Sequence, residues 1–185
     1  MAIHRNRHDP SKNFVGFIVG DVEYAVAIGQ VKEIANPLEV VSLPHAPDAI
    51  VGVADYRGEV VPVIDLRTRF GLIGAELTRK TKWIVLEAAP AQRADGTTVH
   101  DRRLIALVVD SVTEVFGTGG ANVRPAPSLG GGDVTRGIGG VTTHGKKLVF
   151  VLDTARLRDL TEPLAVAGRI GPEAVAPGLS TRPTT

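Results

Sequence analysis

The run Val60-Val61-Pro62-Val63-Ile64-Asp65 is the most informative part of this sequence, because it returns near the C-terminus as Leu148-Val149-Phe150-Val151-Leu152-Asp153. Both runs are short, apolar and closed by an aspartate, which predicts a strand that leads directly into a helix capped by that aspartate. Arg and Leu, both good helix formers, follow each aspartate, and Gly71 is placed to end the first helix. Pro62 cannot donate to a neighbouring strand, so we expect an edge or a bulge there.

Two further pieces repeat in the same order. Val31-Lys32-Glu33-Ile34 returns as Val112-Thr113-Glu114-Val115, and the spacing between Gly52 and Gly58 returns between Gly139 and Gly145. The offset is 81 residues for the first pair and 87 or 88 residues for the others. Val-rich strands can resemble one another by chance, but order and spacing agree here as well as composition. We predict two similar half-domains, each with a Val-x-Glu element, a hairpin and a strand that enters a short helix.

The rest of the chain reads as short strands separated by turns. Runs rich in Val and Ile, bounded by Gly, Pro, Asn or Asp, predict strands over 14–19, 22–26, 39–43, 59–65, 81–87, 104–110, 112–116 and 148–152. Residues 88–103 are polar and predict a long exposed hairpin loop. Residues 1–13 and 161–185 are expected to be flexible tails, the second because it is rich in proline. The expected domain covers 14–160 and is an all-β barrel or sandwich.

Composition excludes several classes of protein. The chain has 185 residues, no cysteine and a net charge of +1, so disulfides, thiolate metal sites and a nucleic-acid surface are not expected. The longest apolar run in the body is far shorter than the roughly 20 residues of a membrane-spanning helix. The N-terminus lacks the apolar run of a signal peptide. We therefore expect a cytoplasmic protein that does not insert into the membrane.

No catalytic or cofactor motif is apparent in the sequence. The five histidines are spread over the tail and three separate turns, without the spacing of metal ligands. Gly130-Gly131-Gly132-Asp133 is not followed by the Lys and Ser or Thr of a phosphate-binding loop. Asp65 and Asp153 are better explained as helix caps than as catalytic acids. We expect no metal, no cofactor and no enzyme activity; the alternative is an enzyme whose site is assembled from distant residues.

A binding surface is the remaining possibility, and the turn Asp55-Tyr56-Arg57-Gly58-Glu59 is its first candidate. One reading is a solvated hairpin tip in which Gly58 supplies a positive φ. The other reading is an anchor for a partner, since Arg and Tyr are enriched in interface hot spots.

The stretch from Ile50 to Gly71 closely resembles the signature of CheW-like domains. So do Gly20 to Tyr24, Val31 to Ile34, Val108 to Val112, Val123 to Pro127 and Gly137 to Gly139, which follow the family order over about residues 14–160. The resemblance implies two intertwined five-stranded SH3-like β-barrels and a stand-alone adaptor. The implied partners are the regulatory domain of a CheA-type histidine kinase and the cytoplasmic tip of chemoreceptors, with recruitment to membrane-associated receptor arrays. The alternative pathway is a non-flagellar one, such as twitching motility or development.

The resemblance also implies a set of partner-binding residues. These are Val31, Glu33, Gly52, Arg57, Val112 and Val115. Asp55 and Tyr56, which belong to the same turn as Arg57, are further candidates that the resemblance does not supply. Core packing is an equally good explanation for the valines at 31 and 112, surface charge for the glutamate, and a tight turn for the glycine. The family usually has Asn-Leu-Arg-Gly where this chain has Asp-Tyr-Arg-Gly, so the choice of receptor is open.

Overall fold

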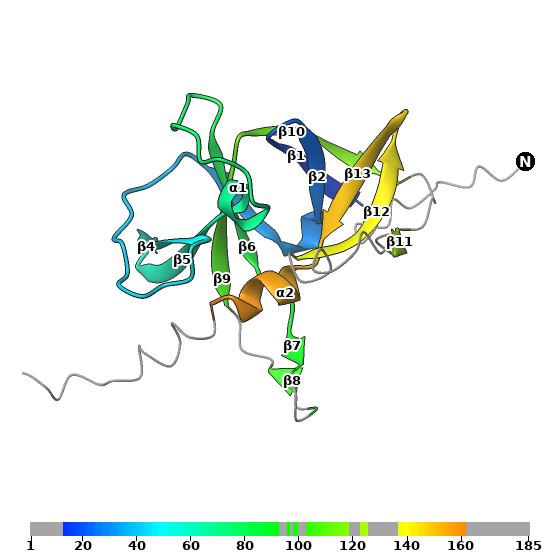
Figure 1. The fold of residues 1–185 in the computed structure, drawn as a ribbon. Helices are drawn as coiled ribbons and strands as arrows, with labels where there is room; N and C mark the ends of the chain where they lie inside the picture. Colours follow the sequence, from blue (N-terminus) through cyan, green and yellow to red (C-terminus); the bar gives the residue numbers. More distant parts are fainter. Residues whose placement is uncertain are drawn as a thin grey trace, which may run out of the picture.

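Strands dominate the structure and form two main sheets (Figure 1). The computed structural model describes residues 13–92, 96, 98–99, 103–118, 123–125 and 137–161. The six-stranded sheet has the order β10 (Ser111–Gly117), β1 (Asn13–Val19), β2 (Val22–Ala27), β13 (Lys147–Leu152), β12 (Ile138–His144), β11 (Arg124–Pro125). The five-stranded sheet has the order β3 (Val31–Ala35), β6 (Lys82–Glu87), β9 (Leu104–Val109), β5 (Glu59–Asp65), β4 (Ile50–Tyr56). The short elements are β7 (Ala91–Gln92), β8 (Thr98–Val99), η2 (Ile28–Gln30), α1 (Leu66–Arg69) and α2 (Thr154–Asp159).

The two sheets are built on one plan. In the order β10-β1-β2-β13-β12, each strand has its equivalent in β3-β6-β9-β5-β4. In both orders the contact between the third and fourth strands is parallel, β2 with β13 and β9 with β5, whereas the other contacts are antiparallel. The chain passes from β2 to β3 and from β9 to β10, and each time it leaves one sheet for the other. The expected pair of intertwined five-stranded barrels is thereby confirmed.

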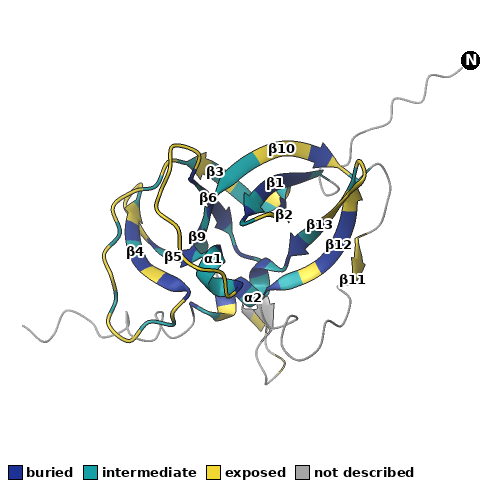
Figure 2. Ribbon diagram, turned by 45° about the horizontal axis from the view of Figure 1, so that its top comes forward, coloured by how far each residue is buried: buried dark blue, intermediate teal, exposed yellow. Residues whose placement is uncertain are grey.

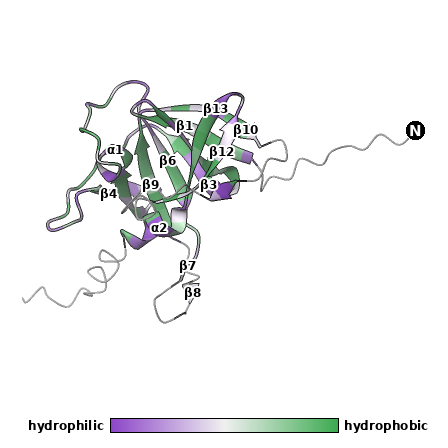
Figure 3. Ribbon diagram, turned by 45° about the vertical axis from the view of Figure 1, so that its right-hand side comes forward, coloured by the Kyte–Doolittle hydropathy of each residue, from purple (hydrophilic) through white to green (hydrophobic). Residues whose placement is uncertain are grey.

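Three apolar clusters fill the structure, as the buried segments in Figure 2 show. One cluster contains only residues of the five-stranded sheet and another only residues of the six-stranded sheet. The third and largest combines strands of both sheets with α1 and α2, and we call it the inter-barrel core. Trp83 and Val85 of β6 face the interior of their own barrel, while Ile84 and Leu86 face the inter-barrel core. Alternate residues of a strand point to opposite faces, so β6 is buried on both sides and reads as a continuous apolar run (Figure 3).

Polar groups hold the two places where the chain crosses between barrels. After β9, the carboxylate of Asp110 accepts hydrogen bonds from the backbone N–H of Gly20 at 2.7 Å and from Nε of Arg67 at 2.9 Å. After β2, Nε2 of Gln30 donates a hydrogen bond to the hydroxyl of Thr154 at 2.9 Å. The same hydroxyl accepts a hydrogen bond from the backbone N–H of Ala89 at 3.1 Å. At each crossing, hydrogen bonds therefore link the connecting segment to the first turn of a helix and to the loop of a hairpin.

The predicted strand-to-helix junctions are confirmed. Asp65 accepts the backbone N–H of Arg67 at 2.9 Å, and Asp153 accepts that of Ala155 at 3.0 Å. Gly71, with φ of 75°, follows α1. Pro62 pairs with Val53 of β4, whereas the ladder with β9 runs only from Val63 to Asp65. β5 therefore has a strand on one side only at Pro62, as expected.

Some expectations were wrong. Residues 39–43 do not form a strand: only Val41 pairs, in an isolated bridge with Val53 of β4, and its neighbours in the chain have no ladder partner. β4 and β12 are strands that our predicted set lacked, since their glycines weaken the strand pattern. The equivalent of Gly52 is Gly140, since both follow the irregular step in their hairpins, and Gly139 is one residue too early.

Other expectations fall partly outside the described residues. Residues 88–103 connect the antiparallel strands β6 and β9, as a hairpin loop would, and their described part includes β7 and β8. The proposed tails lie outside the described residues except at their inner ends, where β1 begins at Asn13 and Thr161 is buried. Within the described part of the chain, no helix has the length and apolar character needed to cross a membrane.

Candidate partner-binding site at a hairpin tip

The hairpin of β4 and β5 ends in a two-residue turn made by Arg57 and Gly58. Their φ values are 56° and 85°, and two positive φ values in succession define the type I′ turn that suits the twist of a hairpin. The backbone N–H of Gly58 donates to the carboxylate of Asp55 at 2.7 Å. The expected positive φ of Gly58 is confirmed, and Asp55 stabilises the turn.

Three side chains meet at this tip, and we call them the hairpin-tip triad: Glu33, Tyr56 and Arg57. One carboxylate oxygen of Glu33 accepts a hydrogen bond from the Tyr56 hydroxyl at 2.5 Å and another from the Arg57 guanidinium at 2.6 Å. The guanidinium carbon of Arg57 also lies 5.3 Å from the centre of the Tyr56 ring, within cation–π range. The hydrogen bond to Glu33 raises the pKa of Tyr56, with a smaller contribution from desolvation.

The triad closes a barrel and leaves one side chain available to a partner. Glu33 comes from β3 and Tyr56 from β4, which are the two outer strands of the five-stranded sheet. Their contact joins the ends of that sheet through side chains. The Arg57 side chain remains 73% exposed although Glu33 and Tyr56 hold it in place. Its planar group, with donors in a fixed fork, is therefore oriented towards solvent.

The surface beside the triad is charged. A shallow cavity of about 390 Å³ is lined by Tyr56 and Arg57 together with Lys32, Glu59, Glu87 and Leu104. Lys32 and Glu87 form an ion pair at 2.7 Å across β3 and β6. A partner that docks here meets fixed charges of both signs.

Gly52 does not belong to the triad. A Cβ atom at this position would collide with the backbone carbonyl of Val41, and its φ is 154°. A Cβ atom on Gly140, its equivalent in the other barrel, would lie 2.6 Å from the carbonyl oxygen of Arg124. Gly52 lies against the segment at Val41, and Gly140 lies against the neighbouring strand β11. A close approach of two backbone segments therefore explains both glycines.

The three predicted valines lie apart from the triad. Val31 and Val112 are half-buried and pack against the inter-barrel core. Val115 is 54% exposed on β10, in the other barrel. The predicted residues therefore do not form one site: some lie at the polar tip, Val31 and Val112 pack against the shared core, and Val115 is exposed on the other barrel.

One relevant residue was missing from our predicted set. His144 ends β12 as Tyr56 ends β4, and its Nδ1 lies 3.9 Å from the carboxylate of Glu114, the equivalent of Glu33. The His144 ring also stacks on Phe116 with 4.3 Å between ring centres. The repeat, with its offset of 88 residues, places His144 at the position equivalent to Tyr56. Because histidine and tyrosine are different residue types, a comparison of the two runs by residue type does not pair them.

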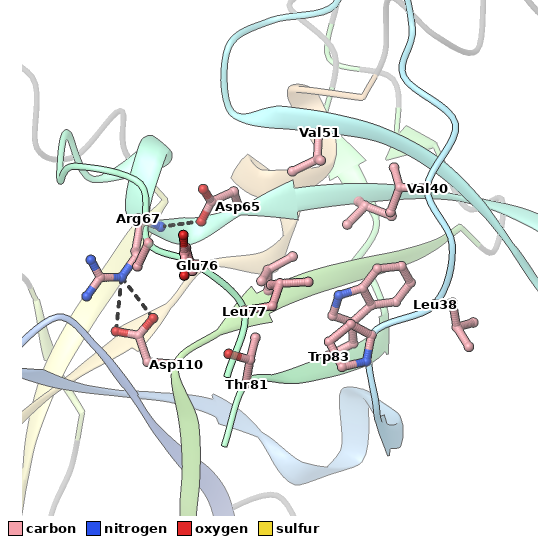
Figure 4. Close-up of a pocket in the computed structure, with 14 residues that line it drawn as sticks. Leu38, Val40, Val51, Asp65, Arg67, Glu76, Leu77, Thr81, Trp83 and Asp110 are labelled. Atoms are coloured by element: carbon pink, nitrogen blue, oxygen red, sulfur yellow. Dashed lines mark hydrogen bonds and ion pairs between the residues drawn. The ribbon is translucent and has the colours of Figure 1, made fainter. Parts of the chain in front are cut away.

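A second concave region lies at the α1 end of the five-stranded barrel, and we call it the barrel-end pocket. Figure 4 shows its polar side chains gathered at one end and its apolar side chains at the other. Asp65 is occupied as the cap of α1, and Asp110 pairs with Arg67. Among the described residues, no group of three or more His, Asp or Glu side chains is arranged to hold a metal ion.

Comparison with known proteins gives a consistent result. The family model of the CheW-like domain matches residues 13–162. The chain is 30% identical over 146 residues to a chemotaxis protein CheW of Klebsiella aerogenes, covering 79% of this chain and 81% of that protein. A shorter match, 40% over 57 residues, covers 31% of this chain and 36% of protein FrzA of Myxococcus xanthus. The crystal structure of scaffolding protein TtCheW from Thermoanaerobacter tengcongensis superimposes with a TM-score of 0.63 at 25% identity, covering 77% of this chain and 88% of that one.

Proposed function

This chain belongs to the CheW family of chemotaxis adaptors, and from that premise we propose that it couples chemoreceptors to a CheA-type histidine kinase without catalysing a reaction. The two partners are the cytoplasmic tip of a receptor and the regulatory domain of the kinase. Binding to receptors recruits the protein to membrane-associated arrays, so that no part of it has to enter the bilayer.

The observation that carries this proposal is the hairpin-tip triad. Tyr56 and Glu33 hold the guanidinium of Arg57 from one side, and the other side faces solvent. An arginine held in this way loses less conformational entropy when it binds a carboxylate or a backbone carbonyl. The triad therefore suits a partner that offers such acceptors, and we propose the receptor helix for this role.

The second partner surface is proposed on the other barrel. Val115 is exposed on the outer strand β10, as its equivalent Ile34 is on β3. A kinase barrel that packs on β10 would leave the triad free for a receptor. Separate surfaces permit simultaneous binding, which a coupling protein requires, and weak single contacts gain strength in an array.

The test is a pull-down with a receptor cytoplasmic fragment and with the CheA regulatory domain, each alone and both together. The parent protein is expected to form a ternary complex. Arg57→Glu is expected to lose the receptor and retain the kinase, because it places a carboxylate where an acceptor must bind. Arg79→Glu, at an exposed arginine away from the triad, is the matched control. Unchanged receptor binding by Arg57→Glu would remove Arg57 as a contact.

A second candidate function is the same adaptor role in a non-flagellar pathway. The match to protein FrzA, which extends over 57 residues, favours this second function. The departure at Asp55 and Tyr56 from the usual Asn-Leu pair bears on this choice, since both residues shape the tip that would meet the receptor. A pull-down with receptors of both kinds of pathway separates the two functions.

A further inference from the structure

The barrel-end pocket is separate from the adaptor surfaces described above. It has a volume of about 250 Å³ and shares no lining residue with the hairpin-tip triad. Val63, Trp83 and Val108, from three neighbouring strands, form part of its wall. The pocket therefore lies against the apolar interior of one barrel.

The indole ring of Trp83 lines the pocket. Trp83 is 2% exposed. Figure 4 shows the nitrogen-bearing edge of the ring facing Leu77 across the pocket. The indole N–H is a hydrogen-bond donor, so a ligand that brings an oxygen to this edge of the ring can accept a hydrogen bond from it.

Apolar side chains continue from the wall of the pocket to its mouth. Leu38, Val51 and Leu77 all line it, and they are 42%, 43% and 65% exposed. They come from three separate segments: the connection before β4, β4 itself and the connection before β6. Contiguous exposed apolar surface of this kind marks contacts with other molecules.

The polar end of the pocket is acidic. It carries three carboxylates, those of Asp65, Glu76 and Asp110, and one guanidinium, that of Arg67, which gives a net charge of −2. Arg67 and Asp110 neutralise one another at 2.9 Å. Glu76 has no ion-pair partner among the described residues, so its charge is available to a ligand.

We propose that the barrel-end pocket binds a protein segment in which an aliphatic side chain is flanked by lysine or arginine. The aliphatic side chain enters between Leu77 and Trp83, a backbone carbonyl accepts the indole N–H, and the basic side chain lies against Glu76. The apolar mouth extends beyond the pocket, and a protein segment covers that surface whereas a small molecule does not. The proposal does not depend on the adaptor function.

The single tryptophan of the chain makes the test direct. The full-length protein labelled with nitrogen-15 is titrated with the acetylated and amidated peptide Lys-Ala-Leu-Ala-Lys, and the indole N–H resonance of Trp83 is followed. A saturable shift is expected. The peptide Lys-Ala-Ser-Ala-Lys is expected to bind about thirtyfold more weakly, because its hydroxyl replaces a buried isobutyl group. No saturable shift, equal binding of the serine peptide, or equal binding of acetyl-leucine amide would each overturn the proposal.

Two variants test the acidic end. Glu76→Gln is expected to weaken the lysine peptide about twofold to fivefold at low salt, the range of an exposed ion pair. Glu59→Gln removes the same charge at the hairpin tip, outside the pocket, and is expected to bind the peptide as the parent does. If both variants bind equally well, Glu76 is not a contact and the proposed basic flank is wrong.

Discussion

Replacing three glycines by alanine separates a structural role from a contact role at Gly52. Gly52→Ala combines two costs, because its φ is 154° and its Cβ would overlap the carbonyl of Val41. Gly58→Ala has only the cost of an unfavourable φ, since the φ of Gly58 is 85° and nothing lies within 4 Å of the added Cβ. Gly140→Ala has only the second, since its Cβ would lie 2.6 Å from the carbonyl of Arg124 and its φ is not in the left-handed region.

The magnitudes follow from these contacts. An unfavourable positive φ costs about 1 to 2 kcal/mol for alanine, and overlap with a backbone atom costs about 1 to 3 kcal/mol. If the two costs add, Gly52→Ala lowers the free energy of unfolding by about 2 to 5 kcal/mol, more than either Gly58→Ala or Gly140→Ala. The loss of backbone entropy in the unfolded chain is common to all three variants and cancels in the comparison.

Urea unfolding of the full chain, followed by circular dichroism, measures the three values with a common slope. Receptor pull-down is carried out on the same preparations. We expect Gly52→Ala to lose binding only in proportion to its unfolding. A Gly52→Ala protein that stays within about 0.5 kcal/mol of the parent and still fails to bind would refute the steric argument and make Gly52 a direct contact.

Two further predictions concern polar contacts. Asp110→Ala is expected to lower the free energy of unfolding by about 2 to 4 kcal/mol, because it leaves the backbone N–H of Gly20 and the Nε–H of Arg67 without their acceptor. Urea unfolding with a change below about 1 kcal/mol would contradict this. The Tyr56 hydroxyl donates to Glu33, which raises the pKa of Tyr56, so folding favours the protonated phenol. That stabilisation is complete below about pH 10, the ordinary pKa of tyrosine, and is lost as the pH rises through the pKa of Tyr56 in the folded state. Unfolding measured over alkaline pH should therefore show a steeper loss for the parent than for Tyr56→Phe, and parallel curves would count against the Tyr56–Glu33 bond.

The division of the site between the two barrels could not be read from the sequence. Glu33 and Arg57 are 24 residues apart, and nothing in a linear pattern says that β3 and β4 form the two ends of one sheet. Tyr56 departs from the family pattern, and only the structure shows that its hydroxyl binds Glu33. The same holds for His144 and Glu114, whose spacing in the chain differs from that of Tyr56 and Glu33.

The sequence alone determined the repeat, the strand-to-helix junctions at Asp65 and Asp153, the turn at Gly58 and the absence of cysteine chemistry. These features are local: the alternation of apolar residues, the capping oxygen of an aspartate and the positive φ of a glycine act over a few residues. Only the tertiary structure decided that β2 and β3, like β9 and β10, belong to different barrels. It also decided that the carbonyl of Val41 leaves no room for a side chain at Gly52, and that Arg57 is held by two neighbouring side chains. Those outcomes depend on contacts between residues far apart in the chain, and such contacts exist only once the two barrels have closed around a shared core.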